Sequence, residues 1–467
     1  MFKPNTKLTI MLSVMGLGVS AQQSYSLQEA VNYAVKNNYQ IQQANIDVAI
    51  SNKKVKETTA IGLPQVKAEA SFNDFLNIPV QVAPADAFGF PDWMNQALAL
   101  SAIQNGIDIP DQDPNAISEF QFGQKFSASA GITASQLLFD GSYFVGLQAA
   151  KAYLNYAELG AERTASEVKT SVSKTYINVV AANENIKALS ENKENIDVIY
   201  SETLMLFESG FIEKQNADQI RLLQSNVKNQ LLFAKRQRKA VLNLLKFQMG
   251  VRITDSISLT DDIDALVELG SEDALVLMNE PFGVDKHIDY RTMAQGERLS
   301  ELSLSNTRAG FYPQLSAFIS HTENAYRNEF NFLEGGGSWY PTTLWGLQLN
   351  VPIFSSGMRY MQAQQSKLEL AKIQSQKLQL EQSLNMAAIN SSSNYRSALD
   401  RYETVSDDLE LAKSIKETNQ IKYNEGMASS TDITQAESQY LQTLGNYINT
   451  TIELLNAKLD LVTAYGK

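Results

Sequence analysis

Hydrophobic residues follow two different periods along this chain. In four runs they alternate with polar residues, within residues 65–77, 123–139, 313–325 and 341–354. Because successive side chains of a β-strand point to opposite faces, these runs predict four strands. Phe318 breaks the alternation in the third run. Each run has about ten residues, the length of a tilted strand that crosses a bilayer.

Elsewhere, apolar residues recur every three or four positions over long stretches, which predicts helices with one apolar stripe. A spacing sustained over such lengths is typical of a coiled-coil seam. A helix from Gly141 to Gly210 would extend roughly 100 Å, which indicates a rod or tube rather than a globule. In chain order, the stripes contain Tyr176, Val179, Ala182, Ile186, Leu189, Ile196, Ile199, Ile220, Leu223, Val227, Leu231, Ala234, Tyr395, Leu399, Tyr402, Val405, Leu409, Ala412, Ile415, Ile433, Ala436, Tyr440, Leu444, Tyr447, Thr451 and Leu454.

Two short polar segments interrupt the helical pattern. They are ESGFIEKQNADQ at residues 208–219 and NEGMASSTDITQAE at residues 424–437. Each contains a glycine, Gly210 or Gly426, that can adopt the left-handed geometry with which many helices end. We therefore expect the chain to reverse at both segments, so that each half forms a long antiparallel helical hairpin.

The residues after each glycine are expected to cap the returning helix. Gln215 and Asn216 in the first tip, and Ser429–Asp432 in the second, offer side chains to the open N–H groups of a helix start. The tetrapeptide Thr-Gln-Ala-Glu at residues 434–437 also matches the capping-box pattern.

The two halves of the chain repeat one plan. Each half has the order helix, Pro-Gln, strand, loop, strand, Phe-(x)-Gly, long helix, glycine break and long helix. This order predicts a first structural repeat over residues 22–250, a linker over 251–286 and a second repeat over 287–467. The matching landmarks are GLPQV with GFYPQL, QLLFDG with VPIFSSG, and FESGF with YNEGM.

The N-terminal residues 1–21 have the pattern of a secretory signal peptide. Lys3 and Lys7 precede an apolar stretch, and small residues precede a predicted cleavage before Gln22. No later segment has 18 consecutive apolar residues, so no transmembrane helix is expected in the mature protein. We therefore expect an exported protein.

Composition restricts the chemistry of the chain. A net charge of −12 argues against nucleic acid as a partner. The sequence has no cysteine, which excludes disulfides, thiolate metal sites, cysteine nucleophiles and a lipid-modified N-terminal cysteine. The two histidines, His287 and His321, lie far apart in sequence. No metal, cofactor or catalytic site is predicted.

The four strands fit either a half-buried sheet of a soluble protein or part of a membrane barrel. The membrane interpretation is favoured because their polar positions hold mostly small groups, and aromatic residues gather near the strand ends. Four strands cannot close a barrel, so this interpretation requires several chains to pool their strands. Residues 78–121, rich in Pro, Asp and Asn, are expected to form a long loop on the outer side.

These features together resemble the TolC family of outer membrane efflux proteins. The resemblance covers nearly the whole mature chain. It depends on the repeat, the opening YSLQEAVNYAVKNN at residues 25–38, the Pro-Gln strand starts and the two hairpin tips. It implies a mainly helical homotrimer, with a twelve-stranded β-barrel in the outer membrane and a tunnel of twelve long helices across the periplasm. Residues 251–286 would lie in a belt around this tunnel.

The resemblance also implies a role and partners. The tunnel would be the passive exit duct of a tripartite efflux pump or a type I secretion system, without catalysis. A periplasmic adaptor would dock on the hairpin tips and join the duct to an inner-membrane transporter of RND or ABC type. The tip residues expected to meet the adaptor are Gly210, Phe211, Gly426, Met427 and Ser429.

Gate residues of the family carry over only in part. Tyr423 matches a tyrosine that locks the tip in some members, but Ala428 occupies the position of its usual arginine partner and Asn216 the position of an aspartate. Asp432 matches the first of two constriction aspartates, and Gln435 replaces the second. Asp432 is expected to cap its helix, to place a charge in the lumen that favours cations, or to do both.

Three other classes of protein fit the sequence less well. An exported periplasmic adaptor would have one hairpin rather than two, and a coiled-coil scaffold without a pore would lack strands of bilayer length. An enzyme would need a nucleophile with a base, or a phosphate loop. Adjacent carboxylates such as Asp261 and Asp262 face different ways on a helix.

Overall fold

The computed structural model describes residues 23–84, 92–107, 117–121, 123–268, 271–332 and 334–467. The chain divides into two compact units. The helical unit combines Met1–Val55, Gln148–Leu304 and Gln364–Lys467, and the sheet unit combines Lys56–Leu147 and Ser305–Ala363. The signal peptide predicted at residues 1–21 lies outside the described residues.

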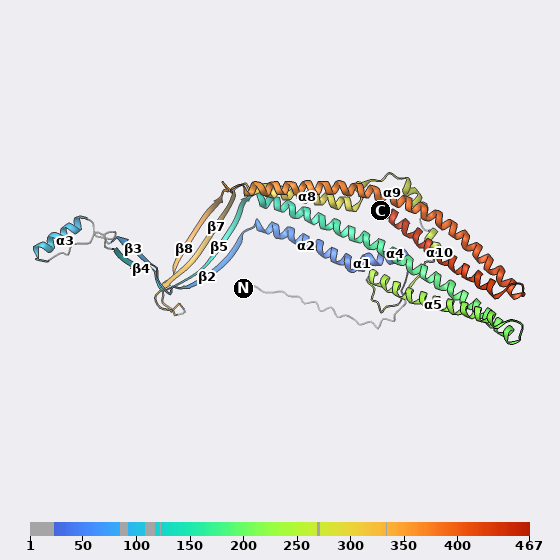
Figure 1. The fold of residues 1–467 in the computed structure, drawn as a ribbon. Helices are drawn as coiled ribbons and strands as arrows, with labels where there is room; N and C mark the ends of the chain where they lie inside the picture. The colour runs from blue at the N-terminus through green and yellow to red at the C-terminus, as the bar shows by residue number, and fades with distance from the viewer. Residues whose placement is uncertain (1–22, 85–91, 108–116, 122, 269–270, 333) are drawn as a thin grey trace. The chain divides into compact units, whose positions relative to one another are not determined.

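The longest helices form two consecutive pairs of nearly equal lengths (Figure 1). Helix α4 (Gly141–Glu208) has 68 residues and is followed by α5 (Lys214–Met249) with 36. Helix α9 (Met358–Asn424) has 67 residues and is followed by α10 (Ser430–Ala464) with 35. The shorter helices α1 (Leu27–Asn37) and α2 (Tyr39–Ile61) precede the first pair, and α8 (Ile288–Ala309) precedes the second. The mainly helical class predicted from the sequence is confirmed.

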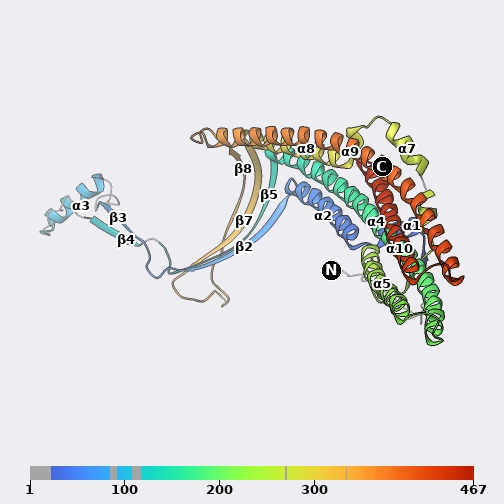
Figure 2. The same cartoon turned by 45° about the vertical axis from the view of Figure 1, so that its right-hand side comes forward.

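Apolar layers join the two hairpins inside the helical unit. Leu189 of α4 packs with Leu231 of α5, and Leu441 of α10 packs against this pair. Closer to the tips, Ile199, Ile220 and Ile433 of the same three helices form another buried layer. The layers recur at the three-four spacing of the sequence stripes, which is what a seam between helices requires. Figure 2 shows the hairpins α4–α5 and α9–α10 side by side.

Short elements pack against the helices between the two halves. Strand β1 (Gln23–Tyr25) pairs in parallel with β6 (Ile257–Leu259), and α6 (Ile263–Glu268), α7 (Ser271–Asn279) and the 3-10 turn Val284–Lys286 follow. The buried hydroxyl of Tyr176 on α4 donates to the carbonyl of Tyr25 at 2.9 Å and lies 3.1 Å from the Asp261 carboxylate. Burial and the Asp261 charge raise the pKa of Tyr176. Asp261 therefore has a structural role here.

The sheet unit contains a four-stranded antiparallel sheet in the order β2-β5-β7-β8 (Figure 1). Its strands are β2 (Gln65–Asp74), β5 (Phe126–Asp140), β7 (Gln314–Arg327) and β8 (Tyr340–Asn350). Strand β8 stops four residues short of the predicted end at 354, because Pro352 has no N–H to continue a ladder. Strands β2 and β8 form the two open edges of the sheet.

The two faces of this sheet differ in polarity. Cross-strand pairs such as Ala68 with Ile132 form one apolar face, and pairs such as Ser71 with Ser129 form one polar face. The hydroxyls of Ser71 and Ser129 lie 2.8 Å apart.

An ionisable pair interrupts the apolar face. His321 of β7 lies opposite Ile132, with its Nδ1 2.7 Å from the Thr343 hydroxyl and its Nε2 3.5 Å from the Glu323 carboxylate. The sequence alternation in this run did not draw attention to these side chains.

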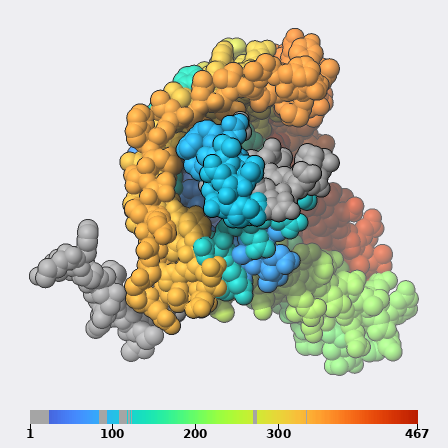
Figure 3. Space-filling view, turned by 90° about the vertical axis from the view of Figure 1, so that its left-hand side faces the viewer, coloured from blue at the N-terminus to red at the C-terminus, as the bar shows by residue number. Residues whose placement is uncertain are grey.

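The sequence predicted a long loop over residues 78–121, but this segment contains regular elements. These are β3 (Val80–Pro84), helix α3 (Asp92–Gln104) and β4 (Ile117–Gln121), and β3 pairs antiparallel with β4. Ala, Leu, Met and Gln, all strong helix formers, dominate α3 and outweigh the polar residues around it. Its apolar residues Trp93, Leu98, Leu100 and Ile103 are exposed. Figure 3 draws this helix in blue.

No helix in the described ranges combines the length and apolar character needed to cross a membrane.

Candidate functional site: the hairpin tips

Both hairpins turn with the same backbone geometry. Gly210 has φ of 79° and Gly426 has φ of 76°, in the left-handed region that glycine adopts without strain. In the first tip, the N–H of Phe211 donates to the carbonyl of Leu206 at 2.9 Å. In the second tip, the N–H of Met427 donates to the carbonyl of Lys422 at 2.7 Å. This bond satisfies a terminal carbonyl and ends the helix.

An exposed apolar residue follows each glycine. Phe211 is 79% exposed and Met427 is 73% exposed. The two tips thus present matching apolar side chains beside their turns. Ser429, two residues after Met427, is also exposed.

The second returning helix has a reciprocal cap. The hydroxyl of Ser429 accepts from the N–H of Asp432 at 3.3 Å, and the Asp432 carboxylate accepts from the N–H of Ser429 at 2.8 Å and from its hydroxyl at 2.7 Å. The capping box is therefore Ser429 with Asp432, and the box predicted at residues 434–437 is wrong, because Thr434 lies inside α10 and donates to the Ser430 carbonyl.

The charge of Asp432 is stabilised by this cap. Hydrogen bonds from Ser429 lower the pKa of Asp432. The bond from the Ser429 backbone has the larger effect, and the bond from its side chain the smaller one. Asp432 is thus a capping residue at the third helical position, while the N-cap itself is Ser429. Both Asp432 and Gln435 are exposed on α10.

The first returning helix is capped differently from the prediction. Helix α5 begins at Lys214 with Glu213 as its N-cap, and Glu213 makes no side-chain capping bond. Gln215 and Asn216 lie in the first turn of the helix, after its N-cap, and neither forms a capping box with Glu213. Asn216 instead faces the second hairpin, where its Oδ1 lies 2.7 Å from the Ser430 hydroxyl.

Polar contacts join the two tips of one chain. The hydroxyl of Tyr423 on α9 lies 2.7 Å from the hydroxyl of Thr203 on α4. The buried Ser430 hydroxyl lies 2.7 Å from Oδ1 of Asn216 and 2.7 Å from Oε1 of Gln219, so it donates to one of them at a time. Tyr423 therefore bonds to the other hairpin, without the arginine or aspartate of the family pattern.

The sequence pattern indicated Tyr423 and Asn216 as tip residues and Ser430 only as a capping residue, and it gave no role to Thr203 or Gln219. One signal was available. Thr203 lies four residues after Ile199 and continues its buried stripe, so a hydroxyl at this position needs a partner.

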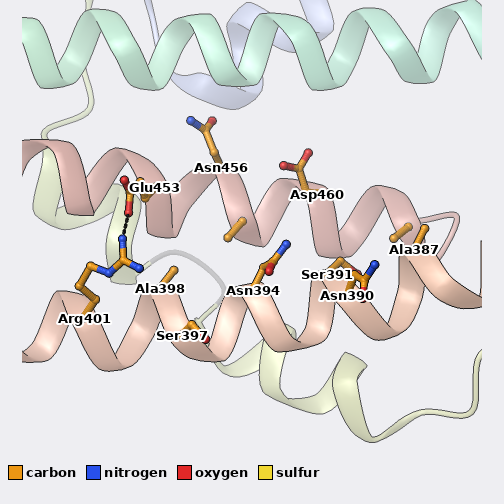
Figure 4. A pocket seen from close by; sticks show the side chains of 12 residues that line it. Ala387, Asn390, Ser391, Asn394, Ser397, Ala398, Arg401, Glu453, Asn456 and Asp460 are labelled. Carbon is orange, nitrogen blue, oxygen red and sulfur yellow. Dashed lines mark hydrogen bonds and ion pairs between the residues drawn. The ribbon is translucent and has the colours of Figure 1, made fainter.

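A groove of about 540 Å³ lies between α9 and α10, farther from the tips. Figure 4 shows its small side chains and, near one end, the ion pair of Arg401 with Glu453, whose atoms are 2.7 Å apart. Asn456 lines the groove, and its buried Oδ1 has no hydrogen-bond partner within the described chain. Within the same residues, no group of three or more His, Asp or Glu side chains is placed to hold a metal ion.

Comparison with known proteins supports the resemblance noted from the sequence. The family model "Outer membrane efflux protein" matches residues 289–467. No curated protein matches the sequence.

Solved outer membrane channels are similar in structure over almost the whole chain. The CmeC channel of Campylobacter jejuni is 18% identical, with 94% of this chain and 85% of CmeC covered at a TM-score of 0.67. VceC of Vibrio cholerae is 13% identical, with 94% and 96% covered at 0.65. The open state of the MtrE channel of Neisseria gonorrhoeae is 16% identical, with 94% and 88% covered at 0.66. At these identities the likeness shows the fold.

The fold is therefore that of outer membrane efflux channels. Residues 289–467 carry the sequence pattern of the outer membrane efflux proteins, and the resemblance to this family is confirmed.

Proposed function

We propose that this chain is one subunit of a passive exit duct in the outer membrane. Three copies of its four-stranded sheet would supply the twelve strands of one closed barrel. The observation that carries this proposal is the sheet itself, with one apolar face and two unpaired edges in a channel fold. An open sheet edge leaves backbone groups unpaired in lipid, so the edges must meet those of other copies.

The paired helices would continue the barrel as a tunnel through the periplasm. At about 1.5 Å per residue, the 68 residues of α4 and the 67 residues of α9 each extend roughly 100 Å. The matched lengths of α4 with α9 and α5 with α10 support the tandem repeat of residues 22–250 and 287–467. In this arrangement, the groove between α9 and α10 would receive side chains from a neighbouring copy.

The tips would be the docking site for a periplasmic adaptor. Exposed Phe211 and Met427 offer an apolar contact at equivalent positions of the two hairpins, next to Gly210, Gly426 and Ser429. The adaptor would join the duct to an inner-membrane transporter of RND or ABC type. Cargo selection would belong to that transporter, in an efflux pump or a type I secretion system.

The links at the tip would form the gate of the duct. Tyr423 with Thr203, and Ser430 with Asn216 and Gln219, hold the second hairpin beside the first. Asp432 and Gln435 lie exposed on α10 beside these links, and three copies of the Asp432 carboxylate would favour cations.

The test is fractionation followed by planar-bilayer recording of the full chain. The proposal expects recovery from outer membranes in detergent, and steady cation-selective currents without an energy source. Recovery as a folded soluble periplasmic protein that gives no current would instead support the adaptor or scaffold alternative.

A further inference from the structure

Three polar side chains form a buried layer between the hairpins. Lys416 of α9 donates from Nζ to Oδ1 of Asn192 on α4 at 2.6 Å. The same Nζ lies 3.4 Å from the carboxylate of Glu437 on α10 and 4.4 Å from the centre of the Tyr440 ring. The side chains of Lys416 and Glu437 are only 9% and 1% exposed. We call Asn192, Lys416 and Glu437 the polar layer.

Apolar layers lie on both sides of it along α4. Leu189 comes three residues before Asn192 and packs with Leu231, while Ile196 comes four residues after it and packs with Leu223. Asn192 thus occupies a position of the apolar stripe that would ordinarily hold a residue such as leucine. The polar layer is therefore an interruption of the seam rather than a surface feature.

This interruption is costly and is incompletely compensated. Within the described chain, no donor meets the distance and angle of a full hydrogen bond to either carboxylate oxygen of Glu437, and Nδ2 of Asn192 lies near this carboxylate without such a bond. Burial raises the pKa of Glu437, and the nearby Lys416 and Asn192 oppose this rise only in part. The ion pair with Lys416 is therefore the main compensation for the buried Glu437 charge. Buried ion pairs of this kind seldom add net stability, but a buried polar residue in a helical seam can fix which residues face each other.

The spacing connects the polar layer to the tip links. Lys416 lies seven residues before Tyr423 on α9, and Glu437 lies seven residues after Ser430 on α10. Seven residues are about two helical turns, so Lys416 and Glu437 each share a helix face with a residue that bonds across the tip. A shift of the second hairpin along α4 would therefore break the contacts of the polar layer and the hydrogen bonds at the tip together.

We infer that Asn192, Lys416 and Glu437 are positioning residues, which fix the register of the second hairpin against α4 so that Tyr423 meets Thr203. The layer determines one register because an apolar seam accepts a slipped pairing at small cost, whereas slippage here leaves two buried charges apart. The consequence for gating depends on the proposed function; the register itself does not.

The absence of cysteine allows a direct test with spin labels on the full chain in detergent. The exposed Phe211 and Met427 are replaced by Cys and labelled, and labelled chains are mixed with an excess of unlabelled chains. Pulsed electron paramagnetic resonance then measures the distance between the two spin labels, and so between the two tips, within one chain. We expect a single narrow distance distribution when the polar layer is intact.

Each of Lys416→Met and Glu437→Gln should broaden this distribution. The exchange variant Lys416→Glu with Glu437→Lys should narrow it again, and it also keeps the test decisive if a single variant folds poorly. Lys174→Met is the matched control, because its exposed ion pair with Asp460 joins α4 to α10 at 2.5 Å outside the layer. That control should leave the distribution unchanged.

Unchanged distributions in both single variants would overturn the inference, and so would equal broadening by Lys174→Met. Bilayer recording separates this result from the proposed function. If both single variants broaden the distance distribution but the wild type gives no current, the duct is refuted and the positioning role stands. If the wild type gives current but neither single variant broadens the distribution, only the positioning role is refuted.

Discussion

The hydroxyl of Tyr423 lies 2.7 Å from the hydroxyl of Thr203, across the junction between the two hairpins of one chain. Tyr423 is half-buried and packs beside Ile199, Ile220 and Ile433, so water competes little for this bond. The two tips are thereby joined within one chain.

Tyr423→Phe should loosen the tip while preserving the ring packing. Loss of one partly buried hydrogen bond costs about 1 kcal/mol, which corresponds to about a fivefold shift between two states. Mean current in planar bilayers should rise accordingly. Tyr402→Phe is the control on the same helix, because its hydroxyl makes only a long 3.5 Å contact with Tyr447. Equal currents from both variants would contradict a gating role for Tyr423.

Asp432→Ala should lower cation selectivity in planar bilayers if the carboxylate lines the lumen. Asp432→Asn removes the charge but keeps an acceptor for the cap, so it separates the two roles. A fall in selectivity with both variants indicates a lumenal charge. Unchanged selectivity with both, together with frayed helicity in Asp432→Ala, would show that the carboxylate only caps α10.

If Asp432 lines the lumen, the cation selectivity that it provides should persist in mild acid. Hydrogen bonds from Ser429 lower the pKa of Asp432 in the folded protein. A depressed carboxyl pKa favours folding above the unfolded value of about 4, and the effect is lost as the pH falls through the folded-state pKa. Selectivity should therefore stay constant from neutral pH to about pH 4 and decline below it. A decline centred near pH 6 would identify another group as the source.

Gly210→Ala and Gly426→Ala should each destabilise their tip by about 1–2 kcal/mol, the cost of a left-handed backbone at a residue with a Cβ. The space around both positions is open, so conformation rather than crowding is responsible. Gly160→Ala is the matched control inside α4, also in open space, and should be neutral or stabilising by up to about 1 kcal/mol. Thermal unfolding followed by circular dichroism compares the three variants.

The pair His321 and Glu323 provides a test of the proposal that the apolar face of the sheet meets lipid. Replacing both with leucine should raise the unfolding temperature in lipid, because polar groups on a lipid-exposed face are destabilising. Glu69→Leu on the opposite face is the control and should bring no such gain, since Glu69 lies in an exposed ion pair with Lys67. A lower unfolding temperature for the double variant would mean that this face meets a polar environment.

The spacing of hydrophobic residues along the sequence was enough to predict most of the strands and long helices. Alternation marked the segments that became β2, β5, β7 and β8, because a sheet with unlike faces requires that pattern. Helix α3 was missed because Pro, Asp and Asn around it suggested a loop, although its own residues favour a helix.

The site was less predictable than the fold. Two capping patterns lie five residues apart at the start of α10, and the sequence does not rank them. The structure uses the first, since Glu437 of the second is buried beside Lys416. Thr203 and its partner Tyr423 are 220 residues apart along the chain, and only the packing of the helices brings them together.

The most direct test of the central proposal is the number of chains in the intact particle. Native mass spectrometry of the full protein, released from detergent micelles, measures that number while circular dichroism verifies folding. The proposed duct predicts three chains, which close one barrel from three four-stranded sheets. A correctly folded protein that remains a single chain would contradict it.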